Sequence, residues 1–484
     1  MQKKLVAGVD CSTQSTKVLV VEIDSGEVIA SGRVSHNVYR DGPASETDPD
    51  NWWNALAGAL SQTGCSERIE AISIAAQQLG LVTLDKEHKP LRPAILWDDT
   101  RSAVAAEQLI NGLGGPLRLA ELVGTQPLAG FSVSSWSWLR NAEPSLAEKT
   151  AFIRLPHDYL TEKLTGNGIT DRGDASGTGW WSSRKNEYVS EILNHPLVGL
   201  DASMLPKVLQ PNEKAGEVNH QSADWTGLQK GIPVACGTGD NMAAALALAV
   251  EPGTPVISLG TSGTAYMRSQ HAPADVSGQV FAHASASGDH LPITCTLNAT
   301  LAVDNFAEML SLDRVAVAPQ TRVVVMPYLS GERLPYYPDA RGSVVGIDNT
   351  TTAGEILLAA YEGVAFSLVL SIDVLNEHSS GVEKDSPIIL VGGGAKGKVW
   401  QETISRLSGR ELIIPKTEEL VAYGAAAQAA GILSNEPAVE VSARWNAADG
   451  QRIASQAVDS EAIERNSRIR EVSHELNKSG LFVN

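Results

Sequence analysis

The sequence predicts an α/β protein with two domains that share one plan. Its 484 residues exceed what a single hydrophobic core usually organises. Strand patterns alternate with helix patterns along the chain, as they do in α/β domains. A strand–turn–strand segment near the N-terminus also returns about half a chain later, with a threonine at the same point of both turns. We therefore expect a first domain over residues 1–250, a second over 251–445 and a peripheral helical tail over 446–484.

The first segment of each expected domain is a hairpin of short strands. Leu5–Val9 and Thr16–Glu22 flank the polar turn Asp10–Ser15, and Pro255–Leu259 and Thr264–Arg268 flank the turn Gly260–Gly263. Further strands are expected at Val28–Val34, Arg68–Ala76, Pro233–Cys236 and Pro387–Val391, and helices at Pro49–Leu60, Met242–Val250 and Glu355–Leu375. The change of composition at Glu251-Pro252-Gly253 marks the expected domain boundary and hinge.

The charge balance argues against several classes of partner. The chain carries 38 basic and 56 acidic side chains, for a net charge of −18. Such a surface repels phosphate backbones and anionic lipid at long range, so neither nucleic acid nor a membrane is an expected partner. A nucleotide site must then act locally, through backbone N–H groups, helix N-termini and Mg²⁺.

Cysteine usage and the N-terminus indicate a cytoplasmic protein. The four cysteines lie far apart and form no C-x-x-C pair, as expected in a reducing compartment. The apolar run Leu5–Val9 is too short for a signal peptide, and no later apolar run approaches membrane-spanning length. The oligomeric state stays open, a homodimer included.

The two hairpin turns are candidates for binding phosphate. Their bends expose backbone amides, and the hydroxyls of Ser12, Thr13, Ser15 and Thr261 add donors beside Gly260. A hydrogen bond to a charged oxygen contributes roughly 1.5–3 kcal/mol. Asp10 at the end of the first strand would repel phosphate unless a cation lay between them, so Mg²⁺ coordination is its expected role. Two ordinary hairpins remain the alternative.

A glycine-rich segment imitates a P-loop without being one. Gly392 to Lys398 has the spacing of that motif as far as its lysine, but Val399 stands where Ser or Thr must bind Mg²⁺. A turn built on Gly393, Gly394 and Ala395 can still pack closely against a flat ligand such as adenine.

Asp240 stands at the expected N-terminus of a helix. It follows the strand Pro233–Cys236 and opens an Ala-rich helix, where the helix N-terminus should lower the pKa of its carboxyl and keep it ionised. A helix N-cap explains the same residue without any chemistry, and the position alone favours that explanation.

Taken together, these segments resemble the FGGY carbohydrate kinases, and within them the xylulokinases. The resemblance runs from Val6 to about Gly431 and includes these further motifs: Leu91–Arg101, Leu155–Leu160, Asp174–Thr178, Ser258–Gly263, Pro327–Arg333 and Val391–Ala395. It implies two ribonuclease-H-like (actin-like) domains with ATP in the cleft between them.

The resemblance also implies roles by position. Asp240 is similar to the family's catalytic base and Asp10 to its strand-end aspartate near the metal. Thr13, Gly260 and Thr261 fall in the phosphate turns, and Gly393, Gly394 and Ala395 in the adenine-side loop. The implied reaction is transfer of the γ-phosphoryl group of ATP to a small ketose, with Mg²⁺ as cofactor.

The expected sugar pocket departs from the xylulokinase pattern at one position. Leu79 stands where those enzymes usually have a histidine that contacts the ketose, and leucine offers no hydrogen bond. Gln78, Trp97, Asp98 and Asn241 complete the expected pocket, with a core role for Trp97 equally open. Xylulose is the expected acceptor. Alternatives are ribulose or another ketose, a polyol such as ribitol, an actin- or Hsp70-like ATPase without sugar chemistry, and a catalytically silent sugar sensor.

Overall fold

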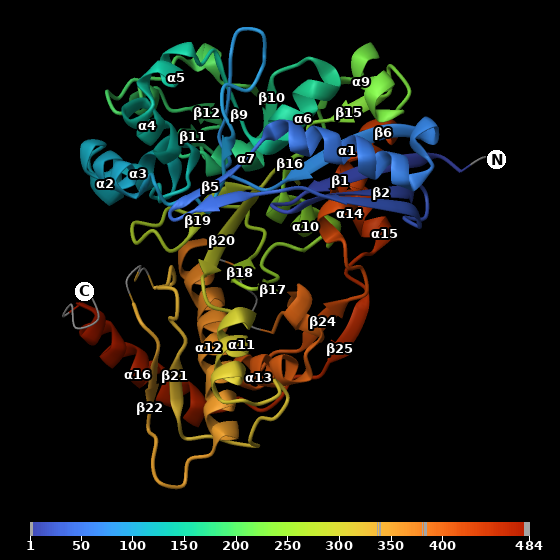
Figure 1. Cartoon of the computed structure of the whole chain (residues 1–484). Coiled ribbons are helices and arrows are strands. Elements are labelled where there is room, and N and C mark those ends of the chain that lie inside the picture. Colours follow the sequence, from blue (N-terminus) through green and yellow to red (C-terminus); the bar gives the residue numbers. More distant parts are fainter. Residues whose placement is uncertain (1–2, 336, 338–339, 380, 382–384, 479–484) are drawn as a thin grey trace.

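The computed structural model contains two lobes, each built around one seven-stranded sheet. It describes residues 3–335, 337, 340–379, 381 and 385–478. The first lobe holds the N-terminal half of the chain and the second lobe most of the C-terminal half (Figure 1).

The sheet of the first lobe has the order β14-β15-β6-β1-β2-β3, with β16 paired to β6. Its core strands β1, β2 and β3 are antiparallel, and β6 runs parallel to β1. The run Leu5–Cys11 is buried throughout, since one face packs on α1 and the other on α14. The strands are β1 (Leu5–Cys11), β2 (Ser15–Glu22), β3 (Val28–Ser35), β6 (Ile69–Ala76), β14 (Lys214–Glu217), β15 (Pro233–Ala235) and β16 (Thr238–Gly239).

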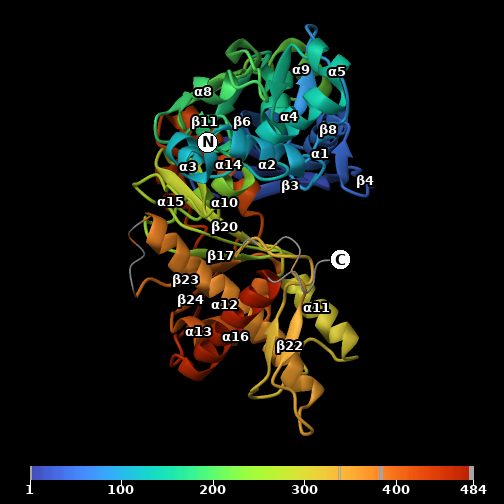
Figure 2. The same cartoon turned by 90° about the vertical axis from the view of Figure 1, so that its left-hand side faces the viewer.

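Helices and short strands of the first half surround this sheet (Figures 1 and 2). The helices are α1 (Pro49–Thr63), α2 (Ala103–Gly112), α3 (Gly115–Val123), α4 (Ser132–Ala142), α5 (Pro144–Lys149), α6 (Pro156–Thr165), α7 (Arg172–Gly177), α8 (Ser190–Leu193), α9 (His220–Thr226) and α10 (Asp240–Ala247). The short strands are β4 (Tyr39–Asp41), β5 (Ala44–Thr47), β7 (Val82–Leu84), β8 (Ala94–Ile95), β9 (Phe152–Arg154), β10 (Ile169–Asp171), β11 (Trp181–Ser182), β12 (Glu187–Tyr188) and β13 (Lys207–Leu209).

The second sheet repeats the plan of the first. Its order is β19-β20-β18-β17-β23-β24-β25, with β17, β18 and β20 antiparallel and β23 parallel to β17. These strands are β17 (Val256–Leu259), β18 (Gly263–Tyr266), β19 (Phe281–Ala284), β20 (His290–Thr296), β23 (Ile388–Val391), β24 (Leu412–Pro415) and β25 (Gly450–Ile453), with β21 (Val324–Met326) and β22 (Ser343–Val345) apart. The pairing pattern of β1, β2, β3 and β6 thus recurs in β17, β18, β20 and β23, as the two similar turns predicted.

The remaining helices belong to both lobes. They are α11 (Thr300–Met309), α12 (Ala353–Ser379), α13 (Lys398–Ser408), α14 (Leu420–Ser434), α15 (Ala438–Trp445) and α16 (Ser460–Lys478). Helices α14 and α15 lie in the first lobe, beside strands far from them in sequence (Figure 1). Tyr423 Oη donates to the carbonyl of Gly26 over 2.8 Å, and Trp445 Nε1 donates to that of Ile23 over 3.0 Å. The spatial lobes therefore do not follow a simple division of the sequence.

The C-terminal tail differs from a simple peripheral helix. Its residues Gly450–Ile453 form β25, an edge strand of the second sheet that pairs antiparallel with β24. Helix α16 follows and packs on α12 and β21. The strand is short and polar, with its two middle residues exposed, so its sequence carried little strand signal.

Helix α12 is the one helix among the described residues that is long and apolar enough to cross a membrane by length and composition. Of its most apolar 18-residue window, 78% is buried inside the protein. Its apolar length is explained by its place in the core of the second lobe, where Leu357, Val364 and Leu375 have no exposed surface.

Candidate functional site

Two cavities meet at the turn between β17 and β18. The first, of about 330 Å³, is lined by residues of both halves of the chain, including Asp240. The second, of about 450 Å³, is lined by residues of the second half, including Gly393 and Gly394. Gly260 and Thr261 line both cavities. A ligand that crosses this turn therefore has one end at Asp240 and the other at the glycine-rich loop.

Asp240 opens helix α10 but does not cap it. The N-cap position belongs to Gly239, and the Asp240 carboxylate accepts hydrogen bonds from the backbone N–H and the side chain of Asn241, over 2.7 and 2.8 Å. The expectation of a lowered pKa is wrong. Burial, together with the charges of Asp10 and Asp174, raises the pKa of Asp240 to about 7, against the opposing effect of the Asn241 hydrogen bonds. The loss of hydration on burial thus raises the pKa of Asp240 by more than its position at the helix N-terminus lowers it.

The wall beside Asp240 combines one amide pair with an apolar surface. Gln78 Oε1 accepts from Asn241 Nδ2 over 3.0 Å, which ties the two expected sugar-pocket residues together. Leu79 also lines this cavity, with a positive φ of 68°, beside Phe131 and Phe281. The cavity therefore offers polar groups on one side and carbon surface on the other.

The hairpin between β1 and β2 positions Asp10 behind the cavity. Asp10 is 4% exposed, and its carboxylate accepts from Ser12 Oγ over 2.6 Å. Lys17 Nζ lies 3.7 Å from Asp10 and 2.6 Å from Glu419, so its charge is shared between two carboxylates. Burial raises the pKa of Asp10, while Ser12 and Lys17 oppose that rise. The charges of Asp10 and Asp240 also disfavour each other, and this arrangement suits a divalent cation near Asp10.

Thr13 connects this hairpin to the first cavity. Its hydroxyl donates to Gln77 Oε1 and accepts from Trp97 Nε1, each over 3.2 Å. Gln77 and Trp97 line the cavity, whereas Asp10, Ser12, Thr13 and Ser15 are not among the lining residues of either cavity. The structure therefore brings the first hairpin next to the cavity rather than into its wall.

Two expected site residues lie elsewhere. Asp98 does not line the first cavity and forms an ion pair with Arg40 over 3.0 Å. Ser15 is 3% exposed, and its hydroxyl accepts from Arg33 Nε over 3.3 Å. Both side chains contact arginines, and neither is among the residues that line this cavity.

The glycine-rich loop forms one side of the second cavity. Gly392 has φ 89°, and a Cβ there would lie 2.6 Å from the carbonyl oxygen of Leu259, so a side chain is excluded. Gly393 and Gly394 line the cavity, and Ala395 is buried beneath them. Tyr361 and Trp400 line it too, their rings in edge contact with centroids 4.5 Å apart. Close backbone and aromatic surface together favour a flat ligand.

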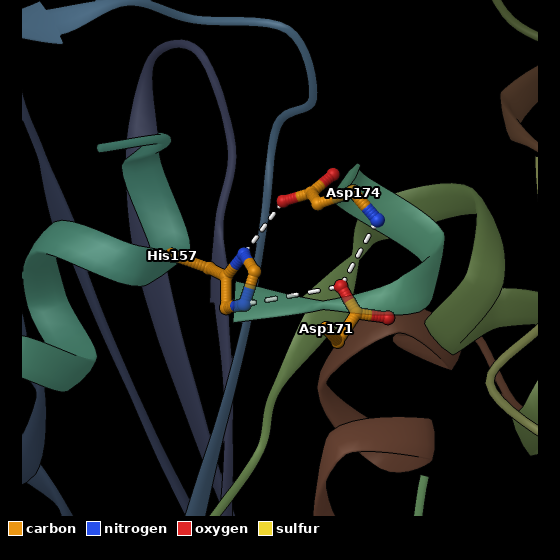
Figure 3. Close-up of side chains that lie close together, drawn as sticks. All are labelled: His157, Asp171 and Asp174. Atoms are coloured by element: carbon orange, nitrogen blue, oxygen red, sulfur yellow. Dashed lines mark hydrogen bonds and ion pairs between the residues drawn. The ribbon is translucent and has the colours of Figure 1, made fainter. Parts of the chain in front are cut away.

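A buried ionic cluster supports the segment that carries Asp240 (Figure 3). His157 Nδ1 lies 2.6 Å from Asp174 Oδ2, and its Nε2 lies 3.9 Å from Asp171 Oδ1. Asp171 accepts from Thr238 Oγ1 over 2.8 Å, two residues before Asp240. Two ligands of one zinc ion, each about 2.0–2.1 Å from the metal in tetrahedral geometry, stand farther apart than 2.6 Å, so His157 and Asp174 fit an ion pair better than a metal centre. Despite the opposing effect of burial, the neighbouring carboxylates Asp158, Asp174 and Asp171 raise the pKa of His157 to about 10.

Comparisons with known proteins identify the family. The model of the N-terminal domain of the FGGY family of carbohydrate kinases matches residues 5–247, and that of the C-terminal domain matches residues 256–432. The chain belongs to the FGGY family of carbohydrate kinases.

Relatives of this FGGY chain cover nearly its whole length. A xylulose kinase from Streptomyces rubiginosus is 50% identical over 95% of each chain, and one from Streptomyces coelicolor is 52% identical over 92% of each. The crystal structure of xylulose kinase from Bifidobacterium adolescentis superposes with a TM-score of 0.82 at 31% identity, covering 97% of this chain and 99% of that one. The predicted pair of actin-like domains is confirmed, and the chain is a carbohydrate kinase.

Sequence analysis missed several residues that line the first cavity of this FGGY kinase. They are Phe131, Phe281, His283 and Arg333. Phe281 and His283 face it because alternate residues of β19 point the same way. Only the motif Pro327–Arg333 carried a signal, and it gave Arg333 no role. Burial lowers the pKa of His283 to about 4, so its ring is neutral at physiological pH.

Proposed function

We propose that this chain transfers the γ-phosphoryl group of ATP to a terminal hydroxyl of D-xylulose and forms D-xylulose 5-phosphate. One observation carries the proposal: the turn holding Gly260 and Thr261 lines both the cavity with the carboxylate of Asp240 and the cavity with the glycine-rich loop. A sugar in the first cavity and a nucleotide in the second would meet at that turn. Family membership supports the reaction class.

Asp240 is the proposed base. Its carboxylate accepts the proton of the sugar hydroxyl as the hydroxyl oxygen bonds to the γ-phosphorus and the bond from that phosphorus to the β-phosphate oxygen breaks. A pKa of about 7 suits this role, because the carboxylate is half ionised near neutral pH and basic enough to hold the proton. The amides of the β17–β18 turn would bind phosphoryl oxygens.

Asp10 is the proposed residue that holds Mg²⁺, directly or through water. The residues fit the ion, because the buried carboxylate of Asp10 and the half-buried carboxylate of Asp240, whose charges disfavour each other, lie beside the proposed phosphate turns. A bound Mg²⁺ supplies charge neutralisation for the phosphoryl oxygens. Thr13, held between Gln77 and Trp97, keeps the hairpin next to the sugar cavity.

The proposed acceptor, xylulose, rests on the names of the relatives, and the lining of the first cavity adds a second candidate. The relatives that are about half identical are named xylulose kinases. The apolar wall of Leu79, Phe131 and Phe281 leaves fewer hydrogen bonds to select one arrangement of sugar hydroxyls, so ribulose or a polyol such as ribitol is the second candidate.

A panel of sugars with Mg-ATP tests the proposal. We expect mass detection to show phosphorylated xylulose, with a higher kcat/KM than for ribulose or ribitol. Asp240→Asn should lower kcat by about 10²–10⁴-fold with ATP binding kept. Asp224→Asn, which changes an exposed carboxylate on α9, is the matched control. Sugar phosphorylation at the wild-type rate by Asp240→Asn would remove Asp240 from the role of base.

A further inference from the structure

We propose that Arg333 is a further catalytic residue, whose guanidinium binds the γ-phosphoryl group while it moves from ATP to the sugar. The inference rests on the proposed function. It concerns a residue of the first cavity that neither the hairpin turns nor the glycine-rich loop contains.

Arg333 is placed in this cavity by a clamped backbone. The neighbouring Glu332 is 1% exposed, and its carboxylate accepts from the backbone N–H of Leu297 over 2.8 Å and from that of Arg333 over 2.7 Å. The Asn298 side chain donates to the same carboxylate over 3.0 Å. The start of the Arg333 side chain is thus fixed, and the residue lines the cavity with Asp240, Gly260 and Thr261.

The Arg333 guanidinium is not neutralised by a described carboxylate. Within the part of the chain that the structure describes, it forms no ion pair within 4.0 Å, unlike Arg92, Arg101 and Arg406. In a chain with 56 acidic side chains, an arginine in a cavity without such a pair has its hydrogen-bond donors available.

The cavity needs a positive charge that its other residues do not supply. Among the described lining residues, Arg333 has the only permanent positive charge, since His283 is neutral. Lys17, the nearest cation to Asp10, is shared between Asp10 and Glu419. Cys295 in the same wall feels the charges of both Arg333 and Asp240, which places these two groups within electrostatic range of one site.

These observations assign Arg333 a role during the transfer of the phosphoryl group. As the sugar oxygen forms its bond to the γ-phosphorus and gives its proton to Asp240, the bond to ADP breaks and charge spreads over the equatorial phosphoryl oxygens. A planar guanidinium donates two parallel hydrogen bonds to such oxygens. Arginines that stabilise the transferred phosphoryl group in other enzymes contribute about 10³–10⁵-fold to kcat.

Arg333→Met tests the role, with the full chain, Mg-ATP and xylulose. We expect kcat to fall by about 10²-fold or more while the KM for the sugar changes less than about threefold. Added guanidinium ion should restore part of kcat, which a structural role would not allow. Arg322→Met is the matched control, because it removes the same charge from an exposed position outside the cavity and should keep wild-type kinetics.

Other outcomes overturn the inference. An Arg333→Met variant with wild-type kcat would exclude the residue, and a raised sugar KM at unchanged kcat would make it a sugar-binding group instead. If Arg333→Met does not fold, Arg333→Lys retains the charge without the planar donor pair, and wild-type kcat in that variant would also refute the proposal. Failure of the wild type to phosphorylate any sugar would instead reject the proposed function.

Discussion

The pH dependence of sugar phosphorylation should report the titration of the Asp240 carboxylate. Its pKa of about 7 is about three units above the usual 3.9 of aspartate, with burial as the largest cause and the charges of Asp10 and Asp174 adding to it. The base acts when ionised, so activity is present above the raised pKa and is lost as pH falls through it. At pH 6 only about a tenth of Asp240 is ionised, and kcat/KM should be about one tenth of its plateau.

Asp174→Asn removes one cause of this shift at a residue that does not itself line the cavity, and the asparagine keeps the size of a side chain that contacts Gln78 and His157. The Asp174 charge raises the pKa of Asp240, so its removal should move the acid limb of kcat/KM to lower pH. The assay is kcat/KM for xylulose from pH 5.5 to 8.5 in a buffer of constant ionic strength. Asp224→Asn, on the exposed face of α9, should leave the limb in place. A flat profile, or a limb that moves to higher pH in Asp174→Asn, would refute this electrostatic reasoning.

Three further substitutions each test one contact of the structure. His157→Gln leaves Asp174 without its cation in a fully buried site, and thermal or urea unfolding should show a loss of about 3–5 kcal/mol, whereas a loss below about 1 kcal/mol would contradict an ion pair there. Gly424→Ala would place a Cβ 1.9 Å from the carbonyl oxygen of Ala243, so the free energy of unfolding should fall by about 1–3 kcal/mol and the melting temperature with it. An unchanged Tm would contradict close packing of α14 on α10. Trp97→Phe removes the hydrogen bond to Thr13 together with part of the ring surface that lines the cavity, and it should lower kcat/KM for the sugar by about 2–10-fold, with unchanged kinetics as the contrary result.

Local patterns made the two hairpins and the glycine-rich loop predictable from sequence. Strand, turn and strand are adjacent in the chain, so the apolar runs on either side of Gly260 and Thr261 gave both the elements and the bend between them. The same holds for the start of α10 at Asp240. The pKa of Asp240 was not predictable in this way, because Asp10 and Asp174 approach it only through the fold.

Adjacent residues in the sequence have different surroundings in the structure. Trp97 and Asp98 were both expected in the sugar pocket, yet Trp97 lines it and Asp98 pairs with Arg40. The packing of α14 on the first sheet was equally hidden. There is no room for a side chain at Gly8, because an added Cβ would lie 1.9 Å from the carbonyl oxygen of Ala422. These two residues are far apart in the sequence.

The path of the chain bears on how the two cavities come together. It crosses between lobes after α10, again between β24 and α14, and once more between α15 and β25, so Glu251-Pro252-Gly253 is only one of three connections. Strand β19 of the second sheet is also bonded to the first lobe, through Ala284 N–H to Ser176 Oγ over 2.9 Å and Ser183 Oγ to the Ala282 carbonyl over 3.2 Å.

These bonds join the two lobes beside the first cavity, where the sugar is proposed to bind. Phe281 and His283 belong to the second sheet, but β19 holds them against α7 of the first lobe, so the sugar cavity is complete in this structure. The second cavity is lined by the second half of the chain. A closing rotation that kept the β19 contacts would pivot near the first cavity and bring the second cavity towards Asp240, which would exclude water from the phosphoryl group.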